Sequence, residues 1–323
     1  MLRGSLCITL WRAKVLFRGL ATALLCCLEL SGVMAFDEPQ SYEQQVLHWR
    51  QKRLERLKSP DGWLAVSGLV WLDEPKEQTE FLIGSSEECR IRLSEESSPA
   101  AAGRLILRDG IVSFTLNDGV SAMFNGQLTE GGILQIDPIK AEADSPDKLQ
   151  VGHTSIHLLR RSGRLAIRLR DAKSPLIRNF PGEDWYPVDA EYRVTAKFLP
   201  YDPPRPILIT NVRGATYEDH LIGAVEFQLG GKAVRLECQQ EGPDDLFIVF
   251  RDATSGRETY GAGRFLNAKK SNDGQVILDF NQTYNPPCAY NIHTLCPLPP
   301  KANHLSIEVP AGAKKPLKPH DAK

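Results

Sequence analysis

Short hydrophobic runs that alternate with polar residues dominate the chain between residues 63 and 170. They recur about every ten residues between Gly, Asp-Gly and Ser-Gly turns, a spacing typical of an antiparallel β-sandwich. The sequence therefore predicts one sandwich-like domain over residues 59–172. Its strands are predicted at residues 81–83, 91–93, 104–107, 111–116, 133–136, 155–159 and 165–169.

A second series of alternating runs predicts another β domain over residues 189–312, with a loop rich in cysteine and proline. The proline-containing segment 173–188 is the predicted connector, and residues 313–323 are a predicted disordered tail. The predicted fold class is thus mostly β, with two antiparallel β-sandwich-like domains. The strands predicted in the second domain are 192–198, 207–212, 222–229, 232–238, 247–250, 259–266, 275–280 and 305–309.

One amphipathic helix is predicted in the N-terminal segment 36–58. Ser41 and Gln44 stand at the spacing of a capping box, in which each side chain bonds the backbone of the other residue. Hydrophobic residues then follow at nearly helical spacing, which predicts a helix from about residue 42 to 57. Ser59-Pro60-Asp61-Gly62 ends it.

The first 35 residues have the pattern of an export signal, and we expect a periplasmic or extracellular protein. Basic residues precede an apolar run from Gly19 to Leu28, and Val33-Met34-Ala35 is a small-residue cleavage pattern. A retained helical or acylated anchor is the alternative. The apolar run is too short for a membrane span, so we expect none in the mature chain.

Composition excludes few functions. The 323 residues are 42% hydrophobic and 24% charged, with a formal net charge of −1. Without a dense basic patch, the sequence does not predict nucleic-acid binding. It also indicates no cofactor and no metal, because His293 and His304 stand near the cysteines at no recognised zinc spacing.

Removal of the signal would leave Cys89, Cys238, Cys288 and Cys296. Export permits disulfides, and a bridge between Cys288 and Cys296 would close the proline-rich loop between them, stabilising it by about 2–3 kcal/mol. The alternative is that both are free thiols that pack as small apolar groups.

Candidate binding residues gather at residues 259–300. The segments 259–266 and 275–280 are separated by a short loop containing Asp273-Gly274, which predicts a hairpin. If Arg264 lies opposite Asp279, then Tyr260 and Asn281 share their face of the hairpin. This face would form a pocket for an anionic group, or Arg264 and Asp279 would form a structural ion pair.

The loop that follows adds Tyr284 and Asn285, and Arg168 and Asp252 are candidates to approach from the side of the first domain. These eight residues make up the predicted ligand site. A Gly-x-Ser-x-Gly nucleophile motif is absent from the sequence.

The run from Leu278 to Tyr290, followed by Cys296-Pro-Leu-Pro-Pro300 and Asn303, resembles the family called domain of unknown function 1684. The resemblance extends over residues 45–312. It includes Gly62 to Leu69, Ile83-Gly84, Arg168 with Asp171, Phe180 to Gly182, Asp252 to Gly256 and Tyr260 to Arg264. It implies a shared fold, and it assigns no catalytic residues.

The first domain also resembles forkhead-associated sandwiches, through Phe81 to Leu93 and the turn at Phe124-Asn125-Gly126. The sequence departs from that pattern because Gly84 is not followed by arginine and no Ser-x-x-His follows. The resemblance implies the sandwich fold without phosphothreonine recognition.

These features lead to three functional hypotheses. The first is a module that binds a small polar or anionic ligand, such as a glycan or a peptide. The second is a hydrolase in which Asp279 or Asp252 acts as general base and Arg264 stabilises negative charge. The third is a structural component of the cell envelope. The sequence does not decide whether the protein is an enzyme.

Overall fold

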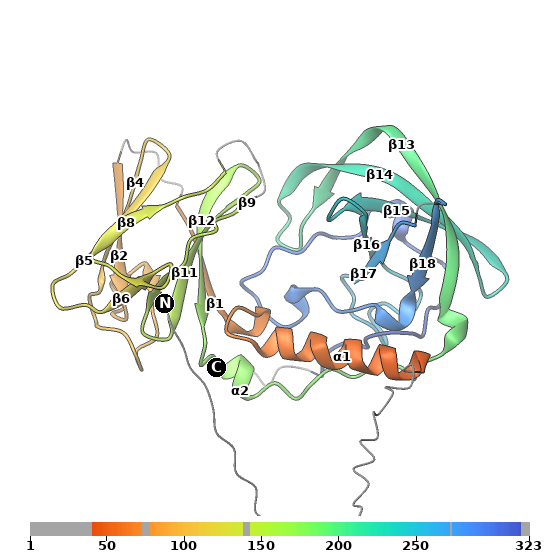
Figure 1. The fold of residues 1–323 in the computed structure, drawn as a ribbon, viewed down its shortest axis with the longest axis horizontal. Coiled ribbons are helices and arrows are strands. Elements are labelled where there is room, and N and C mark those ends of the chain that lie inside the picture. Colours follow the sequence, from red (N-terminus) through yellow and green to blue (C-terminus); the bar gives the residue numbers. More distant parts are fainter. Residues whose placement is uncertain (1–40, 73–77, 138–142, 272, 318–323) are drawn as a thin grey trace, which may run out of the picture. The chain divides into compact units, whose positions relative to one another are not determined.

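The computed structural model describes residues 41–72, 78–137, 143–271 and 273–317 (Figure 1). The predicted signal of residues 1–35 lies outside the described residues. The prediction of a mostly β chain with one N-terminal helix is confirmed. The described residues form one compact unit.

Two sheets make up the first part of the chain. The seven-stranded sheet has the order β1-β12-β11-β10-β6-β7, with β9 paired to β11, and the five-stranded sheet has the order β3-β2-β4-β5-β8. The strands are β1 (Val66–Trp71), β2 (Gln78–Gly84), β3 (Ile91–Arg92), β4 (Gly103–Arg108), β5 (Ile111–Leu116), β6 (Ala122–Phe124), β7 (Gln127–Leu128), β8 (Gly131–Leu134), β9 (Ala143–Asp144), β10 (Leu149–Val151), β11 (Thr154–Arg161) and β12 (Arg164–Asp171).

Both sheets bury their hydrophobic positions in one common core. In β5 the alternation places Val112, Phe114 and Leu116 inside, and in β12 it places Ile167 and Leu169 inside. The intervening residues of β12 therefore point to the opposite face of the sheet, where they take part in the contacts described below.

The turn between β6 and β7 shows how local sequence sets the register. Asn125 and Gly126 both have positive φ, 51° and 83°, as the two-residue hairpin turn requires. The Asn125 side chain also donates to Asp147 at 2.8 Å. Phe124 and Gln127 face each other as a result.

The second part of the chain contains a six-stranded antiparallel sheet with the order β17-β16-β15-β14-β13-β18. Its strands contribute to a second hydrophobic core, which includes Phe227, Phe250 and Phe280. The strands are β13 (Arg193–Thr210), β14 (Thr216–Leu229), β15 (Lys232–Gln240), β16 (Asp245–Phe250), β17 (Arg264–Lys269) and β18 (Gln275–Asp279).

Strand β13 joins two strands that the sequence predicted separately. Pro203, Pro204 and Pro206 lie inside it, although proline cannot donate a ladder hydrogen bond. The strand tolerates them because β18 pairs only with residues 193–197. The proline segment therefore has β14 as its one neighbour, across a register shift between Pro200 and Arg205.

The predicted hairpin of residues 259–266 with 275–280 is wrong. Strand β17 begins at Arg264 and pairs with β16, whereas β18 pairs with β13. The two strands are the opposite edges of the sheet, and an isolated bridge between Lys270 and Val276 brings these edges together. Arg264 consequently lies opposite Phe250, and Asp279 lies opposite Arg193.

The chain after β18 consists of loops and 3-10 turns: η3 (Phe280–Gln282), η4 (Pro287–Ala289) and η5 (Lys301–Asn303). The strand predicted at 305–309 does not form. Leu305 and Ile307 bond the backbone of Arg251 and Ala253, and the Val309 carbonyl accepts from the Arg264 guanidinium. The start of the predicted disordered tail is ordered. Ala313 bridges Trp185, and the Lys315 amide donates to Glu258. Residues 318–323 lie outside the described residues.

Helix α1 (Tyr42–Lys58) confirms the predicted helix and its capping box. The Ser41 hydroxyl accepts from the Gln44 amide at 3.2 Å, and the Gln44 side chain accepts from the Ser41 amide at 2.9 Å. Figure 1 shows α1 along one end of the six-stranded sheet, followed by η1 (Trp63–Ala65). The helices among the described residues, including the short α2 (Pro175–Arg178), do not reach the length and apolarity of a membrane span.

Candidate functional site

Arg264, the centre of the predicted ligand site, is inaccessible. Its guanidinium bonds the Asp252 carboxylate at 2.6 Å, and the two side chains are 1% and 0% exposed. The carbonyl groups of Val309 and Ala311 accept from its two terminal nitrogens, whereas its Nε has no hydrogen-bond partner among the described residues. Burial lowers the pKa of Arg264, and Asp252 opposes this effect. The pair holds the C-terminal segment against the sheet.

Asp279 and Asn281 are also taken up by internal contacts. Asp279 accepts from the Tyr42 hydroxyl at 2.8 Å, and the Asn281 side chain donates to the same hydroxyl at 2.8 Å. Asn281 further exchanges hydrogen bonds with the backbone of Asp189. The two residues therefore fasten α1 to the end of β18.

The remaining predicted residues lie in different places. Tyr260 donates to the Cys288 carbonyl at 3.1 Å. Asn285 donates to the Lys314 carbonyl at 2.7 Å. Arg168 is 4% exposed and lies over the Trp63 ring at 5.1 Å. Its nearest carboxylate, Asp144, is 3.7 Å away. The structure thus does not bring the eight residues into one cluster.

Tyr284 does line a cavity, together with residues of α1 and η1. We call it the Arg–Trp pocket; its volume is about 570 Å³. It is lined by Trp49, Arg53, Arg56, Leu57, Ser59, Asp61, Gly62, Trp63, Glu241, Asn267, Gln282 and Tyr284.

Helical spacing brings three of these side chains to one face of α1. Trp49, Arg53 and Arg56 are four and three residues apart, so they are neighbours along the helix surface. The Arg53 guanidinium stacks on the Tyr284 ring with 4.1 Å to its centroid. The Trp49 and Tyr284 ring centroids are 6.3 Å apart. The aromatic rings and the arginines thus form one continuous wall.

The turn after α1 supplies the second tryptophan. The Gly62 amide donates to the Ser59 carbonyl at 2.8 Å. A Cβ atom at Gly62 would lie 2.3 Å from the Arg56 carbonyl oxygen, so any larger residue would push the chain away from the helix end. The absence of a side chain lets the backbone pass close to α1 and brings Trp63 to the pocket.

The two arginines differ in how much of their charge is compensated. The Arg53 side chain is 12% exposed, lies 3.4 Å from Glu183 and donates to the Asn285 carbonyl at 2.9 Å. Arg56 is exposed and forms no ion pair with any residue that the structure describes. Asp61 on the same rim is bonded to Lys148 at 2.9 Å. Arg56 is therefore the cation of the pocket that is available to a ligand.

Polar groups line the opposite wall. The Tyr284 hydroxyl donates to the Asn267 side-chain oxygen at 2.6 Å, and the Asn267 amide donates to Glu241. Burial raises the pKa of Tyr284 to about 12, so its hydroxyl stays protonated. Burial and Asp245 raise the pKa of Glu241. This wall offers oriented hydrogen-bonding groups.

The sequence alone did not identify Trp49, Arg53 and Arg56 as site residues. Their spacing was visible, but a charged helix face usually points to solvent. One signal in the sequence could have found them. Trp49, Arg53 and Arg56 are spaced by four and three residues, which places a tryptophan and two arginines on one face of a helix, and a second tryptophan follows at Trp63.

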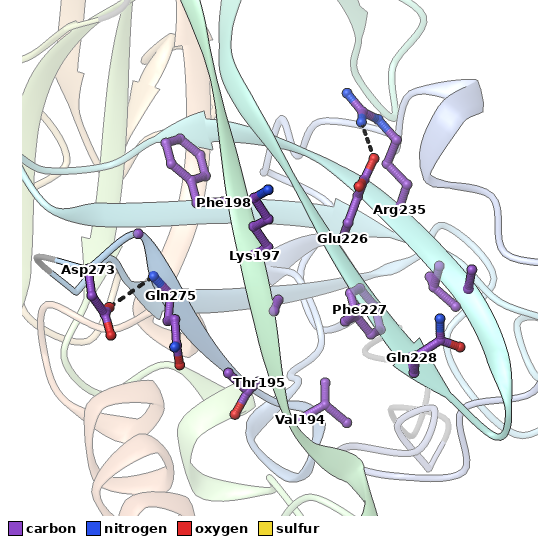
Figure 2. A pocket seen from close by; sticks show the side chains of 14 residues that line it. Val194, Thr195, Lys197, Phe198, Glu226, Phe227, Gln228, Arg235, Asp273 and Gln275 are labelled. Atoms are coloured by element: carbon purple, nitrogen blue, oxygen red, sulfur yellow. Dashed lines mark hydrogen bonds and ion pairs between the residues drawn. The ribbon is translucent and has the colours of Figure 1, made fainter.

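A larger and more open groove is lined by residues of β13, β14, β15 and β18, with a volume of about 1130 Å³ (Figure 2). Two of its charged side chains have partners beside them: Glu226 bonds Arg235 at 2.5 Å, and Asp273 accepts from the Gln275 amide at 3.0 Å. Lys197 also lines the groove and forms no ion pair with a described residue. We place the candidate site in the smaller and more enclosed Arg–Trp pocket, where arginines stand beside aromatic rings.

One comparison with known proteins identifies a family, and that family has no known function. Residues 178–314 match the family model described as Protein of unknown function (DUF1684). A solution NMR structure of an uncharacterized protein of Haloarcula marismortui is 31% identical in sequence. The match covers 45% of this chain and 83% of that one, with a TM-score of 0.38. No curated protein matches the chain. Over residues 178–314 the chain belongs to the DUF1684 family.

Proposed function

We propose that the protein is a binding module for a small anionic ligand, and that the Arg–Trp pocket is its site. The observation that carries the proposal is Arg56, an uncompensated arginine in a pocket that Trp49, Trp63 and Tyr284 also line. An anionic group would bond Arg56, and the body of the ligand would lie against the parts of the aromatic side chains that line the pocket.

The size and lining of the pocket support this function. A volume of about 570 Å³ lies within the range of small-molecule sites, about 300–1,000 Å³. Asn267, Gln282 and Glu241 offer donors and acceptors for hydroxyl groups. Aromatic faces with amide and carboxylate groups suit an acidic sugar, which we take as the first candidate. A short peptide with a free carboxylate is the second.

The hydrolase hypothesis has less support. Asp252 is committed to a buried ion pair with Arg264, and Asp279 accepts from Tyr42 and the Asn281 amide. A general base needs access to the proton that it removes. The third hypothesis, a structural component of the cell envelope, is favoured if the experiment below detects no ligand.

For architecture and location we propose the finer assignment that the sequence predicts. The common core of the five- and seven-stranded sheets supports a forkhead-associated-like sandwich, and the second core supports a separate β domain. The basic and apolar pattern of residues 1–35 supports export.

A thermal-shift screen of the purified mature chain tests the function. The panel holds uronic acids, sugar phosphates, small dicarboxylates and short peptides with free or amidated C-termini. A ligand at about one hundred times its Kd is expected to stabilise the protein by about 2.7 kcal/mol. If no member of the panel shifts the unfolding temperature, the binding function is contradicted and the structural role is favoured.

A further inference from the structure

Cys288 and Cys296 lie against each other as free thiols, although the sequence also predicted a disulfide. The Cys288 amide donates to the Cys296 sulfur at 3.2 Å, and both side chains pack in one hydrophobic cluster. The Tyr260 hydroxyl lies 3.7 Å from the Cys288 sulfur. A disulfide between them needs Cβ atoms about 3.5–4.5 Å apart, and the close packing of the two side chains favours such an approach.

The two sulfurs differ in access and in acidity. Cys288 is half-buried, whereas Cys296 is 5% exposed. The hydrogen bond from the Cys296 thiol lowers the pKa of Cys288, and the Tyr260 hydroxyl adds to this effect. The same contact, together with burial, raises the pKa of Cys296. An accessible, more acidic thiol beside a buried one is the arrangement of an attacking and a resolving cysteine.

We propose that Cys288 and Cys296 form a reversible dithiol–disulfide site, in which Cys288 reacts first with an external disulfide and Cys296 resolves the product. The oxidant is a small-molecule or protein disulfide. The observation that carries the proposal is the contact between a half-buried and a buried thiol, with the Tyr260 hydroxyl beside the reacting sulfur.

The reaction balances as thiol–disulfide exchange. The Cys288 thiolate attacks one sulfur of the external disulfide, whose S–S bond breaks and releases one thiolate. The Cys296 sulfur then attacks the Cys288 sulfur and releases the second thiolate. The two protons of the cysteine thiols pass to the two released thiolates. One disulfide is reduced, and one disulfide forms in the protein.

The site lies next to the candidate pocket without depending on it. Cys288 and Cys296 pack in one hydrophobic cluster with Phe265 and Tyr284. Tyr284 is a wall of the Arg–Trp pocket. Oxidation therefore changes the packing behind that wall, but the exchange chemistry does not need a ligand.

The test is a redox titration of the wild-type mature chain in mixtures of reduced and oxidised glutathione. After acid quenching and alkylation, mass spectrometry follows the tryptic peptide Ser271–Lys301, which holds both cysteines. We expect the peptide to lose two hydrogens reversibly as the oxidised fraction rises. Cys89 and Cys238, which are buried and distant from any second thiol in sequence, serve as internal controls.

Two variants test the order of the steps. In Cys296→Ser we expect a stable mixed disulfide of Cys288 with glutathione, formed about ten-fold faster than any product at buried Cys89. In Cys288→Ser we expect Cys296 to stay unmodified. Thermal unfolding shows that each variant is folded, and Cys296→Ala replaces the serine variant if it is not.

Three results overturn the proposal. The first is that no internal disulfide forms at any glutathione ratio. The second is a disulfide that excess reductant does not open in the folded protein, which indicates a structural bridge. The third is equal reactivity of Cys288 and Cys89. The wild-type titration decides the first two even if every variant fails to fold.

Discussion

At the scale of single residues, the arginine that looked most like a ligand-binding group is a structural one. Arg264 is buried with Asp252, and its N–H groups bond backbone carbonyls near the C-terminus. Removing one partner of such a pair leaves an uncompensated buried charge, whereas removing both is far less costly.

We expect Arg264→Met to lower the free energy of unfolding by about 3–5 kcal/mol. The double variant Arg264→Met with Asp252→Leu should recover part of this loss, because no charge is left unpaired. Denaturant unfolding of both variants measures the difference. A single variant as stable as the wild type would show that the pair does not hold the fold together.

His157 gives a pH dependence with a defined sign. Burial, aided by Arg170, Lys148 and Arg168, lowers the pKa of His157 to about 4, with Asp61 opposing. The unfolded chain has a histidine pKa of about 6.5. Between these values the unfolded state binds more protons, so stability falls as the pH drops from 6.5 to about 4.

The slope due to this residue is at most about 1.4 kcal/mol per pH unit. We expect His157→Gln to flatten the stability profile in that window, since the carboxylates contribute equally to both proteins. The check is the difference between the two urea-unfolding profiles. A difference that does not change between pH 4 and 6.5 would contradict the assignment.

At the scale of elements, helix α1 is fixed by hydrogen bonds between residues far apart in sequence. The Tyr42 hydroxyl donates to Asp279 and accepts from Asn281. We expect Tyr42→Phe to destabilise the protein by about 1–3 kcal/mol, because two largely buried groups lose a partner. Tyr192→Phe is the control, since the Tyr192 hydroxyl forms no hydrogen bond with a described residue. Equal unfolding midpoints of the two variants would refute the anchoring role.

Local signals account for the elements that the sequence predicted well. The capping box sets the start of α1, and the alternation of hydrophobic and polar residues predicted the strands β5, β11 and β12. Short strands such as β7 and β9, with two residues each, carry too little pattern to be found.

Pairing was predicted poorly where it depends on the whole sheet. Successive strands usually pair, so the sequence indicated a hairpin around Asp273-Gly274. In the structure, β17 pairs with β16 and β18 pairs with β13. Arg264 therefore forms its ion pair with Asp252 and not with Asp279, the partner that the hairpin would have given it. The candidate pocket was missed for a similar reason, because α1 meets Tyr284 through contacts that periodicity does not encode.

At the scale of the whole molecule, the N-terminal helix and the C-terminal loop depend on each other. Arg53 connects them by stacking on Tyr284 and by donating to the Asn285 carbonyl. The turn after the helix contributes Trp63 to the same pocket, and the Arg168 guanidinium lies over the Trp63 ring. The pocket thus exists only where four separate segments of the folded chain meet: residues 49–63, Glu241, Asn267 and residues 282–284.

Isothermal titration calorimetry with the strongest ligand of the screen, on Arg56→Gln and Lys52→Gln, tests the account most directly. Both residues lie on α1, but Lys52 pairs with Glu55 and does not line the pocket. We expect Arg56→Gln to weaken binding by about ten-fold to a hundred-fold, as loss of a hydrogen bond to a charged group costs about 1.5–3 kcal/mol. Lys52→Gln should bind as the wild type does. Equal affinities of the two variants would contradict a ligand site in the Arg–Trp pocket.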